Sequence, residues 1–106
     1  MEPMSDEQYN RMIGETILEQ LGGAHRIKVM TGAYDFQIID RGVQWKLKSR
    51  HRNRVKVTLN HMDLYDVTMW KSYGQKQINE KHVTHVYCDF LMATIEDGTG
   101  LYLSFV

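Results

Sequence analysis

The chain has 106 residues, of which 42% are apolar and 25% charged, and its 13 basic side chains balance its 13 acidic ones. These values are ordinary for a soluble globular protein and exclude a disordered chain, which has fewer apolar residues and a larger net charge. The length predicts a single domain over residues 1–106, built around one hydrophobic core.

The composition also predicts where the protein works. The single cysteine, Cys88, excludes an internal disulfide, so a reducing cytoplasm is the expected location. No apolar run approaches the roughly 20 residues that a membrane span requires. The opening residues, MEPMSDEQ, lack the basic and then apolar pattern of a signal peptide. We therefore expect a cytoplasmic protein that makes no membrane contact.

The first expected element is a helix from Asp6 to Leu21. Ser5 and Gln8 have the spacing of a capping box at its start. Gly22 and Gly23 end it, because glycine adopts the left-handed conformation without steric cost. One mostly apolar stripe recurs at three- and four-residue spacing and consists of Tyr9, Met12, Ile13, Thr16, Ile17, Gln20 and Leu21.

Two short apolar segments follow the helix. In residues 25–33, Ile27 and Val29 alternate with other side chains, which favours a short strand that ends at a Thr31-Gly32 bend. The second segment contains Phe36, Ile38 and Ile39, and it precedes a tight turn at 40–42.

The stretch from Arg41 to Lys56 predicts a β-hairpin. Apolar and polar residues alternate on both sides of a polar loop at 49–53, and successive strand side chains point to opposite faces. One set is therefore expected in the core: Val43, Trp45, Leu47, Val55, Val57 and Leu59. The other set is expected on the opposite face: Gln44, Lys46, Lys48, Arg54, Lys56 and Thr58.

This hairpin is also the most basic part of the chain. It holds seven of the 13 basic residues and no acidic one, which predicts a positive surface on an otherwise acidic protein. A further strand is expected where Tyr65, Val67 and Met69 alternate with other residues, and its pairing would place Trp70 on the basic face. The candidate binding residues are Arg41, Lys46, Lys48, Arg50, Arg52, Arg54, Lys56 and Trp70.

A second helix is expected to begin near Asn79 and to end at Gly98, followed by a closing strand at Leu101–Val106. Its expected buried stripe consists of Val83, Val86, Tyr87, Phe90, Leu91 and Ile95. The order of elements predicts an α+β fold. In it, an antiparallel sheet of about four to five strands has an N-terminal and a C-terminal helix packed on one face.

Several stretches resemble a small family associated with bacteriophages, prophages and other mobile elements. They are ILEQLGG at Ile17–Gly23, MTGA at Met30–Ala33, VTLNHMDLYDV at Val57–Val67, and VYCDFL with TGLYLSF at Val86–Leu91 and Thr99–Phe105. The resemblance implies an accessory protein that works in the cytoplasm of a host cell, and it brings no catalytic residue set. The chain departs from the family pattern in its basic loop SRHRN and in Cys88, where small residues such as alanine are common.

Three interpretations of the basic hairpin are open. Its cations are suited to nucleic-acid phosphates, and an exposed Trp70 would stack on a base. The same charges would steer an acidic protein surface onto it. They would also keep a solvent-facing sheet soluble and discourage pairing of its edges.

The sequence gives little support to a metal site or an active site. His82, His85, Cys88 and Asp89 lie at three-residue steps on the expected helix, which separates His82 and Cys88 by about 120° around its axis. Asp63 and Asp66 are more simply read as turn and strand-end hydrogen-bond partners than as an acid and a base. We therefore expect no metal, no cofactor and no enzymatic activity.

The expected function is stoichiometric binding by a non-catalytic phage or mobile-element accessory protein. The most favoured partner is a host protein, plausibly one of a defence system such as CRISPR–Cas, which this protein would inhibit. The alternative is a small nucleic-acid-binding protein that uses the basic hairpin from Arg41 to Lys56.

Overall fold

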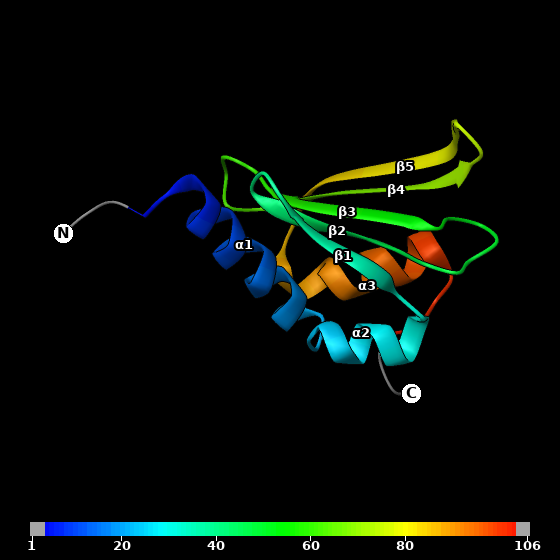
Figure 1. Cartoon of the computed structure of the whole chain (residues 1–106), viewed down its shortest axis with the longest axis horizontal. Helices are drawn as coiled ribbons and strands as arrows, with labels where there is room; N and C mark the ends of the chain where they lie inside the picture. Colours follow the sequence, from blue (N-terminus) through cyan, green and yellow to red (C-terminus); the bar gives the residue numbers. More distant parts are fainter. Residues whose placement is uncertain (1–3, 104–106) are drawn as a thin grey trace.

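The computed structural model of the chain describes residues 4–103. Its elements follow one another as α1 (Asp6–Gln20), α2 (Ala24–Thr31), β1 (Tyr34–Ile39), β2 (Gly42–Lys46), β3 (Arg54–Leu59), β4 (Tyr65–Tyr73), β5 (Lys76–Val86) and α3 (Cys88–Thr99) (Figure 1). The five strands form one antiparallel sheet in which each strand pairs with the next along the chain. The expected α+β fold is confirmed.

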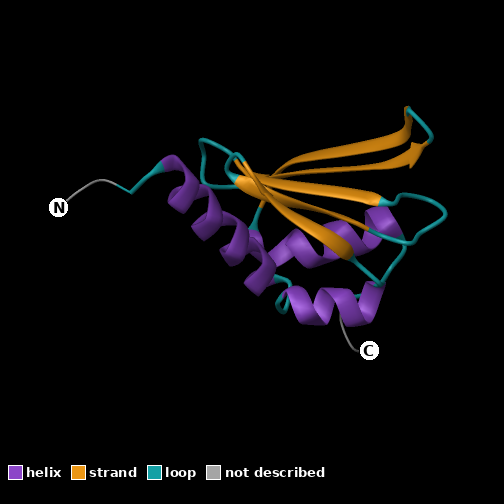
Figure 2. Ribbon diagram, viewed as in Figure 1, coloured by secondary structure: helices purple, strands orange, loops and turns teal. Residues whose placement is uncertain are grey.

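The helices lie together on one side of the sheet (Figure 2). Helix α1 packs mainly against β1 and β2, and α3 packs against β4 and β5. Ser5 and Gln8 form the expected capping box at the start of α1, with hydrogen bonds of 3.1 and 3.2 Å. The hydrophobic core therefore lies in a single layer between the helices and one face of the sheet.

Strand alternation fills this core as expected. Val43, Val57 and Val67 lie beside one another on β2, β3 and β4, and each is fully buried. Trp45 is 2% exposed and packs against the ring of Phe36, with 5.8 Å between ring centroids. Burying a large apolar side chain contributes about 1.5–3 kcal/mol each, so this parity fixes which face of the sheet turns to solvent.

The strand expected in residues 25–33 is wrong, because this segment forms α2. Glycines flank the helix at both ends: Gly23 is its N-cap, and Gly32 closes it with a φ of +74°. Ile27 is fully buried whereas Val29 is 66% exposed. Two apolar residues two positions apart fit the end of a helical stripe as well as they fit a strand, and the flanking glycines carried the better signal.

The helix expected from Asn79 is also wrong over its first half. Residues 76–86 form β5, and the C-terminal helix begins only at Cys88. Gly74, with a φ of +60°, turns the chain back after β4, so that Val83 pairs with Val67 and Val86 with Tyr65. The expected closing strand is not formed by residues 101–103, and its remainder, 104–106, lies outside the described residues.

The two edge strands are irregular. Asp35 on β1, and Asn79 and His85 on β5, have φ values between +56° and +59°, next to interruptions in the strand register. Such bulges twist an edge strand and hinder the addition of another strand. The sheet is therefore better suited to binding through its open face or its ends than through its edges.

Candidate functional site: the helix-free face of the sheet

The face of the sheet opposite the helices, here called the helix-free face, carries the polar side chains of the strands (Figure 2). Two rows of paired residues cross it. The first row is Lys46, Arg54 and Trp70, and the second is Gln44, Lys56, Thr68 and His82. Trp70 is partly exposed, unlike the buried Trp45. The expectation that Trp70 lies on the basic face and outside the core therefore agrees with the structure.

Three shallow depressions lie on this face. One of about 120 Å³ lies beside Arg54, one of about 450 Å³ lies beside Asp66, and one of about 350 Å³ lies beside His82. Gln44 borders the first two, Lys56 the last two, and Trp70 the first and third. The depressions thus surround a central group of polar side chains and can receive protruding groups of a partner.

The charges on the helix-free face are of both signs. The Lys46 ammonium pairs with the Asp35 carboxylate at 2.8 Å. Burial raises the pKa of Asp66, but hydrogen bonds from the Asn60 amide at 3.0 Å and from a backbone N–H at 3.2 Å outweigh it and hold the pKa below its usual value. Glu80 borders the third depression. The face is therefore amphoteric, not uniformly basic.

Arg41 lies apart from the other candidate binding residues. Its guanidinium donates to the carbonyl oxygens of Leu59 at 2.9 Å and Asn60 at 3.4 Å, and it lies over the ring of Tyr9. These contacts join the β1–β2 turn to the β3–β4 loop, at the opposite end of the hairpin from the loop at 49–53. The structure gives this side chain a role in holding two loops together.

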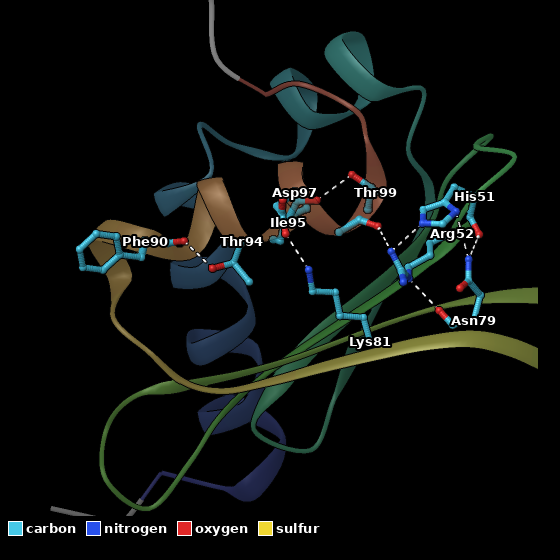
Figure 3. Close-up of polar contacts among 10 residues, drawn as sticks. His51, Arg52, Asn79, Lys81, Phe90, Thr94, Ile95, Asp97 and Thr99 are labelled. Atoms are coloured by element: carbon cyan, nitrogen blue, oxygen red, sulfur yellow. Dashed lines mark hydrogen bonds and ion pairs between the residues drawn. The ribbon is translucent and has the colours of Figure 1, made fainter.

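Arg52 has a similar structural role in the β2–β3 loop. Its Nε donates to the Asn79 carbonyl oxygen at 2.7 Å, and its Nη1 donates to the Gly98 carbonyl oxygen at 2.7 Å (Figure 3). The second contact lies in the last turn of α3, where a positive charge favourably opposes the helix dipole. Arg52 thus ties its loop to β5 and to α3.

The remaining cations of the hairpin are more accessible. Lys48, Arg50 and Lys56 are exposed, and the Lys48 ammonium lies 6.0 Å from the centre of the Tyr34 ring. Arg54 donates to the neighbouring Asn53 carbonyl oxygen at 2.9 Å. Lys46, Lys48, Arg50, Arg54, Lys56 and Trp70 remain predicted binding residues, and they lie on the helix-free face or in the adjoining loop.

Sequence reasoning missed a second basic segment beside this loop. The tip of the β4–β5 hairpin carries Lys71 and Lys76, and the Lys71 ammonium donates to the Arg50 carbonyl oxygen at 2.7 Å. Asn53 and Ser72 exchange two hydrogen bonds, of 2.8 and 3.2 Å. Residues 67–79 contain no Asp or Glu, and this signal was available from the sequence.

The residues weighed for a metal site lie on two different elements. His82 and His85 belong to β5, where His82 contacts Thr68 at 2.7 Å, while Cys88 and Asp89 begin α3. The expectation that all four lie on one helix is therefore wrong. Between residues 4 and 103, no three His, Cys, Asp or Glu side chains converge in the way that a metal site requires.

These features define a class: a small α+β protein with an antiparallel sheet open on one face, polar depressions on that face, and basic loops at one end. None of the helices in the described part of the chain is long and apolar enough to cross a membrane. Comparison with protein-family models, with curated proteins and with solved structures found no match.

Proposed function

We propose that this protein is a non-catalytic accessory protein of a bacteriophage or mobile element, which acts by binding a host protein stoichiometrically. The bound protein is inhibited, and a component of a defence system such as CRISPR–Cas is the target class we favour. The genomic setting rests on the motifs ILEQLGG, MTGA, VTLNHMDLYDV and TGLYLSF. The binding mode rests on the helix-free face.

The observation that supports a protein partner is the mixture of groups around Trp70. Tryptophan and arginine are the residues most often responsible for binding energy in protein interfaces, and Arg54 pairs with Trp70 across the strands. Asp35, Asp66 and Glu80 give the same face carboxylates that would repel a polyanion. A partner surface with charges of both signs suits this face better.

The binding step is tested with purified complexes. The tagged protein is incubated with lysate of the bacterial host, and any complex is separated by gel filtration and its stoichiometry measured. We expect a one-to-one complex that Trp70→Ala weakens by about tenfold or more, the usual cost of losing a central aromatic contact. Phe90→Ala is the matched control, because Phe90 is 62% exposed at the start of α3, on the helix side of the sheet.

The inhibitory step has its own test. A CRISPR-immune host strain expressing the protein is challenged with the targeted phage, and plaques are counted. We expect plating to be restored by the wild-type chain and by Phe90→Ala, but not by Trp70→Ala. An immune response that persists in cells containing the folded wild-type protein would refute CRISPR–Cas as the target. Loss of the one-to-one complex in the control as much as in Trp70→Ala would refute the helix-free face.

A nucleic-acid-binding function is the second candidate. It is favoured by the partly exposed Trp70 beside Arg54, since aromatic rings with neighbouring cations stack on unpaired bases. It is also favoured by the loop at 49–53, whose Arg50 is exposed and has no neighbouring carboxylate in the loop. This candidate predicts affinity that falls steeply with salt.

A further inference from the structure

Two chain segments distant in sequence form one projecting end of the molecule, here called the basic end. They are the β2–β3 loop at 47–53 and the tip of the β4–β5 hairpin at 71–78. Both extend past the helices at the same end of the sheet (Figure 1). The hydrogen bonds between Asn53 and Ser72, and between Lys71 and the Arg50 carbonyl oxygen, hold the two segments together.

The basic end has cations without counter-charges of its own. Its two segments carry five basic side chains and no Asp or Glu: Lys48, Arg50, Arg52, Lys71 and Lys76. Lys71 and Arg52 donate to backbone carbonyl oxygens, which are neutral, so their charges stay uncompensated. The side chains of Lys48, Arg50 and Lys76 are exposed to solvent.

Carboxylates next to the basic end are largely occupied by other cations. Asp97 of α3 pairs with Lys81 at 2.6 Å, and this hydrogen bond lowers the pKa of Asp97 (Figure 3). Asp35 pairs with Lys46 at 2.8 Å. Glu80 follows the hairpin tip but lies in the depression beside Trp70, on the helix-free face. The positive potential of the basic end is therefore not cancelled by its surroundings.

An aromatic ring accompanies these cations. Tyr73, the last residue of β4, is 69% exposed, and Ile78 on β5 is 46% exposed. A flat exposed ring among cations is the combination that binds single-stranded nucleic acid, because the ring stacks on a base while the cations contact phosphates. Nucleic-acid interfaces are much more positive than protein interfaces, which contain both signs of charge and little lysine.

We propose that the basic end binds single-stranded nucleic acid, with Lys48, Arg50, Lys71 and Lys76 contacting the phosphates and Tyr73 stacking on a base. This inference rests on the second candidate function and moves its site from the helix-free face to the end of the sheet. Arg52 and Arg41 are excluded from the contact surface, since backbone carbonyl groups hold their guanidinium groups. The surface lies apart from Trp70 and is free to act while a protein occupies the helix-free face.

The test is fluorescence anisotropy with a labelled polythymidine strand, over salt concentrations from about 0.05 to about 0.2 M. We compare Lys71→Ser/Lys76→Ser with Arg11→Ser/Lys28→Ser, a control pair that removes the same charge from exposed positions on α1 and α2. The hairpin pair is expected to weaken binding about tenfold and to reduce the slope of log affinity against log salt by about 2, one unit for each lost phosphate contact.

The aromatic contact is tested in the same assay. Tyr73→Ala is expected to cost about 1–3 kcal/mol of binding free energy, which corresponds to a loss of about 5- to 100-fold. Tyr102→Ala is the control, since Tyr102 is 66% exposed outside the basic end. A duplex of mixed sequence has no unpaired base to stack and is expected to bind more weakly than the single strand.

Three results would overturn the inference. The first is the absence of salt-dependent binding to the wild-type chain, and the second is an equal loss in the hairpin pair and the control pair. The third is competition by polyglutamate as strong as by unlabelled oligonucleotide, which would identify an acidic protein as the partner. If Trp70→Ala weakens binding and the hairpin pair does not, nucleic-acid binding stands as a function and this surface does not.

Discussion

The position of Arg52 predicts that this residue stabilises the fold more than any other cation of the basic hairpin at 41–56 except Arg41. Its guanidinium donates at 2.7 Å to carbonyl oxygens on both β5 and α3. Hydrogen bonds from a charged donor contribute about 1.5–3 kcal/mol each, and the partial exposure of the site lowers this contribution because water replaces the lost donor. We estimate that Arg52→Ala costs about 2 kcal/mol in free energy of unfolding.

The measurement is urea unfolding followed by circular dichroism, together with thermal unfolding. A loss of about 2 kcal/mol corresponds to a decrease in Tm of roughly 8–16 °C for a domain of about this size. Arg50→Ala is the matched control. It removes the same charge from an exposed side chain two residues away and is expected to change the stability by less than about 0.5 kcal/mol.

The comparison of these two variants is decisive. Equal stabilities for Arg52→Ala and Arg50→Ala would refute the reasoning, because the contacts to Asn79 and Gly98 would then contribute nothing. Arg52→Lys separates charge from geometry. A lysine keeps the positive charge near the end of α3 but has no planar fork with which to reach both carbonyl oxygens, so only partial recovery is expected.

Three further predictions test the fold. Because Trp45 is buried and Trp70 is partly exposed, Trp70→Phe should leave a fluorescence that acrylamide quenches less than it quenches the wild type. Gly42→Ala should cost about 2 kcal/mol in urea unfolding, because the added methyl group meets the Val57 carbonyl oxygen. Burial raises the pKa of Tyr65, so its stabilising contribution is complete below about pH 10 and is lost as the pH rises through the folded-state value. Tyr65→Phe should therefore lose less stability than the wild type above about pH 10.

Each of these predictions has a contrary result. Unchanged quenching in Trp70→Phe would mean that the two tryptophans are equally accessible, and the strand parity would be wrong. A Gly42→Ala variant as stable as the wild type would contradict the close pairing of β2 with β3. Parallel losses of stability in Tyr65→Phe and the wild type at high pH would show that the phenol is not buried on folding.

Local patterns in the sequence predicted the elements whose signals need no distant partner. The capping box and apolar stripe of α1 depend on residues within the helix itself. The alternation of β2, β3 and β4 predicted the burial of Val43, Trp45 and Val57, since a strand with one buried face has only one favourable parity. The solvent-facing position of Trp70 followed from the same argument.

The elements that were predicted wrongly depend on contacts between distant segments. The apolar residues of 79–91 fit a helical stripe, but Val83 and Val86 are buried by pairing with β4, and this gain outweighs the helical preference. In the same way, the sequence shows only that 41–56 is basic. The position of each cation is decided by the partners that the fold supplies.

The sequence by itself therefore determined the α+β class, the first helix, the central strands and the excess of positive charge in one hairpin. Only the tertiary structure decided that Arg41 and Arg52 hold loops together and that Lys71, Lys76 and Tyr73 join Lys48 and Arg50 at one end. The physical reason is that burial and alternation are local properties of a strand. A hydrogen-bond partner or a neighbouring charge is a property of the folded chain.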